Sequence, residues 1–132
     1  MCLLTMPRRE LVVPADLAQL PEIRKFADAV ARESGLSEGD CYRVKSALNE
    51  AVANAIEHGS HRPDDEVAIE VTSEGGSLVF YVRDSGTFRP RVWRGGEISE
   101  RGRGLDFIGQ MMDEVDVRPG KGGTEVRMVK RL

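Results

Sequence analysis

The chain has 132 residues, of which 40% are hydrophobic and 31% are charged, so it is long enough to bury one hydrophobic core. Its 19 basic and 22 acidic side chains give a formal net charge of -3, which excludes the excess positive field that holds a nucleic-acid backbone. The apolar run before Pro7 is too short for a signal peptide or a membrane span, and Cys2 and Cys41 form neither a disulfide framework nor a metal spacing. We therefore expect one cytoplasmic domain over residues 1–132, with no nucleic-acid or membrane partner.

The first half of the chain predicts a short strand followed by two helices. Residues 10–13, with the sequence ELVV, predict a short strand that Pro14 stops, as expected of an edge strand. Asp16 is placed to cap a first helix that ends at Gly35. Ser37 opens a capping box for a second helix over about 41–58, and about 100° per residue gives that helix one core stripe. The stripe consists of Cys41, Val44, Leu48, Ala51 and Ala55.

The second half predicts two hairpins separated by a long loop and a helix. Apolar residues alternate over 67–72 and again over 78–83, with a glycine turn between the two runs. Residues 87–103 show no period, whereas residues 105–115 fit an amphipathic helix. Strands near 116–118 and over 124–130 close the chain around a turn. This order predicts an α+β fold, a two-layer sandwich of a mostly antiparallel mixed sheet with helices on one face.

A carboxylate and an amide lie one turn apart on the second helix. Glu50 and Asn54 fall on the face directed away from the core stripe, so we expect both on one exposed ridge. Glutamate can take a proton from a hydroxyl, and an amide oxygen can bind Mg²⁺ beside phosphate oxygens and water. The pair suits phosphoryl transfer, although a solvated helix face is the simpler interpretation of such a pair alone.

Two glycine-containing segments add further candidates. Asp84 and Gly86 stand where a strand enters a loop, so the carboxylate can accept from an exocyclic amine while the glycine lets a planar ring approach. An ordinary turn has the same residues. The run Arg101-Gly102-Arg103-Gly104-Leu105 enters a helix, where free amides attract phosphate oxygens. It matches neither a Rossmann fingerprint, since Phe107 replaces the third glycine, nor a Walker loop.

These segments, taken in order, resemble the motifs of the GHKL ATPase superfamily, which includes gyrase and the histidine kinases. Residues 48–59, LNEAVANAIEHG, are similar to its N box, Asp84-Ser85-Gly86 to its G1 box, and Gly102-Arg103-Gly104-Leu105 to its G2 box. The glycine and threonine at 123–124 resemble the pair that opens the last strand. The match covers nearly the whole chain and implies the Bergerat ATP-binding fold, with ATP and Mg²⁺ as cofactors.

The resemblance also implies a role for each matched residue. Glu50 would be the general base and Asn54 the Mg²⁺ ligand. Asp84 would accept from adenine, with Gly86 at the point of close approach and Thr124 supporting the same hydrogen bonds. Phosphates would lie against the segment that holds Arg101, Gly102, Arg103, Gly104 and Leu105, and residues 87–103 would form the ATP lid.

Among GHKL proteins, the short N-terminal strand, the minimal Asp-x-Gly box and residues 111–115 are most similar to the anti-sigma-factor serine kinases of bacterial partner-switching systems. A histidine kinase also needs a phosphoacceptor hairpin and gyrase a transducer domain, and neither fits in 132 residues. We therefore expect the acceptor to be a serine on a separate STAS-type anti-anti-sigma protein, and a sigma factor and a second copy of the chain as further partners.

Two alternatives to this function stay open. One is a nucleotide-dependent binding module in which ATP only orders the lid around a partner, without transfer. The other is a switch kinase that phosphorylates a STAS scaffold and never contacts sigma. His58 is expected to be structural, near the last helix carbonyls, and Met111, Met112 and Cys41 are expected in the core, whereas Trp93 in the lid has no assigned role.

Overall fold

The computed structural model describes residues 7–59, 64–84, 105–120 and 123–132. Its elements follow in the order β1 (Arg9–Pro14), the 3-10 turn η1 (Leu17–Gln19), α1 (Leu20–Glu33), α2 (Glu38–Asn54), the π-helical segment η2 (Ala55–Gly59), β2 (Glu66–Glu74), β3 (Ser77–Asp84), β4 (Glu114–Gly120) and β5 (Gly123–Arg131). A further short helix spans 105–111, between β3 and β4.

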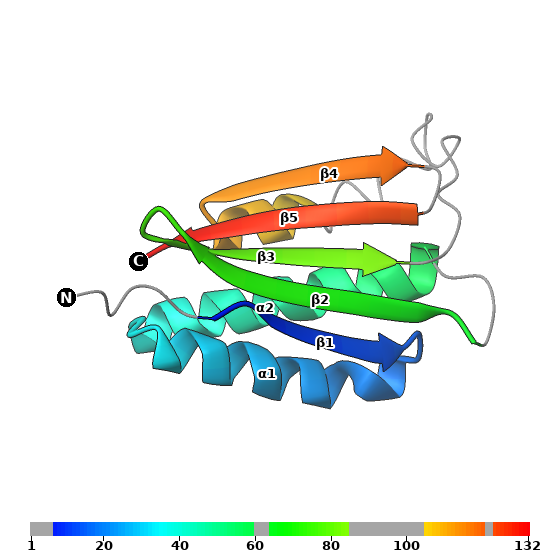
Figure 1. Ribbon diagram of the computed structural model, residues 1–132, viewed down its shortest axis with the longest axis horizontal. Helices are drawn as coiled ribbons and strands as arrows, with labels where there is room; N and C mark the ends of the chain where they lie inside the picture. Colours follow the sequence, from blue (N-terminus) through cyan, green and yellow to red (C-terminus); the bar gives the residue numbers. More distant parts are fainter. Residues whose placement is uncertain (1–6, 60–63, 85–104, 121–122) are drawn as a thin grey trace.

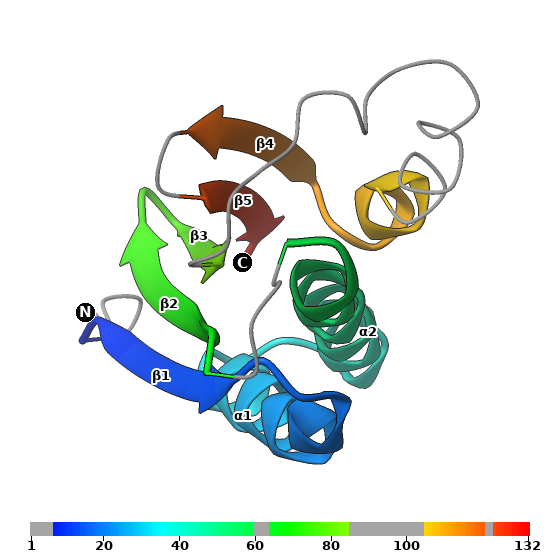
Figure 2. The ribbon, with the colours of Figure 1, turned by 90° about the vertical axis from the view of Figure 1, so that its right-hand side faces the viewer.

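The five strands form one sheet in the order β1-β2-β3-β5-β4, in which every described pair is antiparallel. α1, α2 and helix 105–111 all cover the same face of this sheet (Figures 1 and 2). The predicted α+β two-layer sandwich with helices on one face is therefore confirmed. β1 is an edge strand, as Pro14 predicts, because a proline cannot donate to a second neighbour.

Local sequence explains where these elements begin and end. Gly75 and Gly76 both have positive φ, 55° and 81°, so the β2–β3 hairpin turns where the glycines allow it. The Ser37 side chain accepts from the Asp40 amide at 3.1 Å and caps α2. Asp16 caps η1 rather than α1 itself, and Gly35, at φ 82°, follows the end of α1.

The core lies between the helices and the sheet. The predicted stripe of α2 is buried in full, and it packs with Ile23, Ile69 and Phe80, which are each 0% exposed. Met112 and Cys41 are also buried, and Met111 packs against the core, as predicted. No helix in the described stretches is long and apolar enough to cross a membrane.

One predicted helix end was wrong, and the second helix changes its type before its predicted end at Gly59. The second helix is α-helical only to Asn54, after which η2 continues the chain with a wider turn to Gly59. The helix that begins at Leu105 ends at 111 rather than 115, because Val115 pairs with Met128 of β5 and belongs to β4. Hydrophobic periodicity did not predict this end, because the apolar Val115 fits both the helix pattern and the strand pattern.

The opposite face of the sheet carries a network of ion pairs. Arg83 joins Glu70 of β2 and Glu125 of β5, with N–O distances of 2.8 and 2.7 Å, and its guanidinium lies 5.0 Å from the Tyr81 ring centroid. Arg8 reaches the other oxygen of Glu70 at 2.7 Å. The hydrogen bond from Arg83 holds the pKa of Glu70 below its usual value, against the effect of its burial.

Candidate functional site

Three elements bring candidate residues to one end of the molecule. The end of α2, the end of β3 and the start of β5 lie at the same end in Figure 1. η2, which continues α2, contacts both β3 and β5. Asn54, Asp84 and Thr124 stand at these three element ends, since they are the last residue of α2, the last of β3 and the second of β5.

Asn54 is buried, with 9% of its surface exposed, whereas Glu50 one turn earlier is half-buried. The prediction that both residues share an exposed ridge is therefore wrong for Asn54. α2 lies between α1 and helix 105–111 and against the sheet (Figure 2), so it is contacted on more sides than one stripe predicts. A buried amide beside a half-buried carboxylate offers a polar contact in a setting with little water, where each such contact is stronger.

Asp84 and Thr124 are joined directly. The backbone amide of Thr124 donates to Oδ1 of Asp84 at 3.2 Å, and the two residues are 6% and 4% exposed. The Thr124 hydroxyl is buried and has no hydrogen-bond partner within the described part of the chain. Because a buried hydroxyl without a partner is costly, this atom is suited to a polar group that arrives with a ligand.

Several predicted site residues lie outside the described residues. They include the whole expected lid, 87–103, with Trp93, and the individual positions Gly86, Arg101, Gly102, Arg103 and Gly104. Leu105 is described: it is the first residue of helix 105–111, is half-buried and packs against the core. His58 lies in η2, in the last turn before Gly59.

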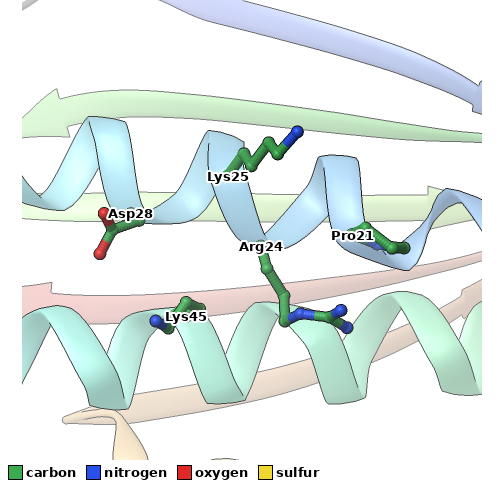
Figure 3. Close-up of a pocket in the computed structure, with 5 residues that line it drawn as sticks. All are labelled: Pro21, Arg24, Lys25, Asp28 and Lys45. Atoms are coloured by element: carbon green, nitrogen blue, oxygen red, sulfur yellow. The ribbon is translucent and has the colours of Figure 1, made fainter.

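A separate groove of about 300 Å³ lies on the helical layer. Its lining contains three cations and one carboxylate, from Pro21, Arg24, Lys25, Asp28 and Lys45 (Figure 3). Arg24 extends from α1 toward α2, where it donates to the Asn49 side chain at 3.0 Å. The groove therefore lies next to the residue that precedes Glu50, but its lining includes none of the predicted nucleotide-binding residues.

Sequence reasoning missed one buried charged residue, Lys130, which is 7% exposed. Alternate positions of β5 are buried, and the last of them is a lysine. These positions hold Thr124, Val126, Met128 and Lys130. A charge at an inward strand position was the available signal, because lysine is almost never fully buried unless it is paired. No group of three or more His, Cys, Asp or Glu side chains suited to a metal occurs among residues 7–59, 64–84, 105–120 and 123–132.

A family profile described as the histidine kinase-like ATPase domain matches residues 13–130. The chain belongs to this family. The matched range contains Glu50, Asn54, Asp84 and Thr124, and the resemblance to GHKL proteins is thereby confirmed.

Relatives of this histidine kinase-like ATPase chain carry informative names. It is 30% identical over 137 residues to the serine-protein kinase RsbW of Bacillus subtilis, covering 93% of this chain and 84% of that protein. It is 32% identical over 132 residues to an anti-sigma F factor of Thermoanaerobacter, covering 92% of this chain and 81% of that protein.

Solved structures agree on the fold. The crystal structure of the RsbU and RsbW domains of a Mycobacterium tuberculosis protein is similar with a TM-score of 0.74 at 20% identity. It matches 96% of this chain, which spans only 32% of that longer chain. The histidine kinase domain of a blue-light activated kinase from Erythrobacter litoralis has a TM-score of 0.61, also at 20% identity, over 91% of this chain and 62% of that one.

Proposed function

We propose that this chain is an ATP-dependent protein-serine kinase and anti-sigma factor, which phosphorylates a STAS-type anti-anti-sigma protein and sequesters a sigma factor. Membership of the histidine kinase-like ATPase family, together with relatives named serine-protein kinase and anti-sigma F factor, supports a serine kinase activity and an anti-sigma role. The STAS acceptor, the sigma partner and a homodimeric, cytoplasmic protein are parts of the proposal.

The observation that carries the nucleotide part is the Asp84–Thr124 pair. A carboxylate that accepts from a backbone amide is held in orientation, and a carboxylate is the type of acceptor that suits the exocyclic amine of adenine. The hydroxyl of Thr124, which has no partner in the described stretches of the chain, lies beside it and can bond the same ring system. These atoms fit a purine because they offer a carboxylate acceptor and a hydroxyl next to each other in a buried setting.

In the proposed phosphoryl transfer, Glu50 acts on the hydroxyl of the acceptor serine. Glu50 orients the serine and takes its proton while the serine oxygen forms a bond to the terminal phosphorus of ATP and the phosphoanhydride bond breaks, releasing ADP. Asn54 would hold Mg²⁺, and the bound ion would neutralise part of the negative charge that develops during transfer. Gly102 and Gly104 are assigned to the phosphates by resemblance, and the burial of Asn54 favours a tight contact.

One experiment separates the proposal from its alternatives. The purified chain is incubated with γ-labelled ATP, Mg²⁺ and each STAS protein and sigma factor of its own genome. Label on a STAS serine, together with an ATP-dependent complex with a sigma factor, is the expected result. Complexes without label indicate the binding module, and label on a STAS protein with no sigma complex indicates the switch kinase.

A further inference from the structure

The described part of the chain buries four polar or charged residues, and three of them, Asn54, Asp84 and Thr124, are candidate nucleotide contacts. The fourth, Lys130, lies near the end of β5 and has no part in the proposed chemistry. Its ammonium donates to the main-chain oxygen of Met111 at 3.1 Å and lies 3.3 Å from a carboxylate oxygen of Asp40. A buried cation with two such partners is costly to lose, so its position is tightly defined.

This contact joins three elements at one point. Asp40 lies in the first turn of α2, Met111 is the last residue of helix 105–111, and Lys130 is the next-to-last residue of β5. We call these three residues the Lys130 clamp. The turn after helix 105–111 is also fastened to β5, because Asp113 accepts from the Arg131 amide at 2.7 Å and donates its own amide to Val129. The clamp adds the link to α2.

Each of the three elements carries a candidate nucleotide contact at its other end. From Asp40 to Asn54 α2 rises about 21 Å, at 1.5 Å per residue. From Lys130 back to Thr124 β5 spans about 20 Å, at roughly 3.3 Å per residue. Helix 105–111 leads from the clamp back over about 9 Å to Leu105, the last residue of the predicted phosphate box. α2 and β5 therefore have nearly equal lengths between the clamp and their candidate contacts, so a fixed point at the clamp keeps Asn54 and Thr124 in register.

We infer that Lys130 is a positioning residue for the nucleotide site: it fixes α2, helix 105–111 and β5 along their axes so that Asn54, on the phosphate side, keeps its place relative to the adenine contacts. This inference rests on the proposed nucleotide binding. The adenine contacts, Asp84 and Thr124, are joined directly to each other and need no clamp. Asn54, on the phosphate side, lies at the far end of α2, and the ion pair of Lys130 with Asp40 ties the near end of α2 to β5.

The test compares ATP with adenosine. In Lys130→Met the apolar stem is kept and the charge is lost, while Asp40 retains Arg43 at 3.0 Å. We expect ATP affinity to fall about tenfold or more, since a shift of about 1 Å in a positioned group costs this much, whereas adenosine affinity stays within about twofold. Both are measured by competition against a fluorescent ATP analogue at millimolar Mg²⁺. Arg131→Met, an exposed cation beside Lys130 on β5, is the matched control and is expected to change neither affinity.

If Lys130→Met does not fold, as judged by circular dichroism, Asp40→Asn replaces it, because this change weakens the clamp without leaving the lysine unpaired. A folded variant whose ATP-to-adenosine ratio equals that of the wild type overturns the inference, even if its melting temperature is lower, because that result indicates a purely structural lysine. Failure of the wild type to bind ATP would instead overturn the proposed function itself.

Discussion

The amide of Thr124 donates to Asp84 across 3.2 Å, while the hydroxyl of the same threonine has no partner among the described residues. Thr124 therefore fixes the Asp84 carboxylate through its backbone amide and leaves its own hydroxyl available to a ligand. A buried hydroxyl without a partner stabilises nothing in the free protein, since it has lost its water and gained no bond. Its cost to the fold is consistent with a ligand-binding role.

Thr124→Val separates the role of the hydroxyl from that of the backbone amide, because valine has nearly the same shape as threonine and no hydroxyl. The free energy of unfolding should stay unchanged or rise by up to about 1 kcal/mol, while ATP affinity falls by about five- to tenfold for one lost hydrogen bond. Chemical denaturation and calorimetry measure the two quantities. Thr124→Ser keeps the hydroxyl and should bind ATP nearly as the wild type does. Full ATP affinity in the valine variant would remove the hydroxyl from the site.

Two glycines should respond to alanine in opposite directions. Gly109 is exposed within helix 105–111, and no described atom lies within 4 Å of an added Cβ, so Gly109→Ala should stabilise by about 0.5–1 kcal/mol through helix propensity. Gly35 has φ 82°, which disfavours any L side chain, so Gly35→Ala should destabilise by about 1–2 kcal/mol. Urea titrations compare them. Destabilisation by both changes would contradict the helical assignment of Gly109.

The sequence predicted the layers and the core stripe of α2, because hydrophobic period and capping residues act locally. It did not predict the burial of Asn54, because that depends on what α2 contacts. A helix packed on α1, the sheet and helix 105–111 buries a wider arc than one stripe, and Ala47 and Val52 are accordingly buried as well. The neighbours of a helix are set by the fold and cannot be read from its own period.

The resemblance predicted Asp84 and Thr124 as partners in one site, and their direct contact follows from β3 and β5 being neighbours. Lys130 escaped notice because a lysine near the end of a strand is usually solvated. Only the assembled fold shows that its ammonium reaches the ends of two other elements. Hydrophobic periodicity gives no information on contacts between residues that are far apart in sequence, so it could not predict these contacts of Lys130.

Acid should weaken the ion pairs on the open face of the sheet. Because Arg83 lowers the pKa of Glu70 in the folded chain, Glu70 contributes stability above the ordinary glutamate pKa of about 4.3 and loses it as the pH falls through the lowered folded value. Glu70→Gln should therefore cost about 1 kcal/mol at pH 7, and this difference should shrink below about pH 4. Urea titrations from pH 7 to 3 measure it. A difference that is constant across this range would contradict the assignment.

Glu50→Gln tests the proposed base. Glutamine keeps the size of the side chain and its ability to bond a hydroxyl, but it cannot take a proton at neutral pH. Because Glu50 is half-buried and lies one turn before Asn54, the fold and ATP affinity should stay within about twofold of the wild type. Phosphoryl transfer to the STAS acceptor should fall by at least a hundredfold, which is about the lower limit for loss of a general base.

Arg24→Met, which changes the groove between α1 and α2, is the control for ATP binding and should leave it unchanged, because no predicted nucleotide contact lines that groove. Undiminished phosphorylation by the Glu50 variant would show that another group accepts the proton, whereas equal loss of ATP binding and transfer would make Glu50 a nucleotide contact rather than the base.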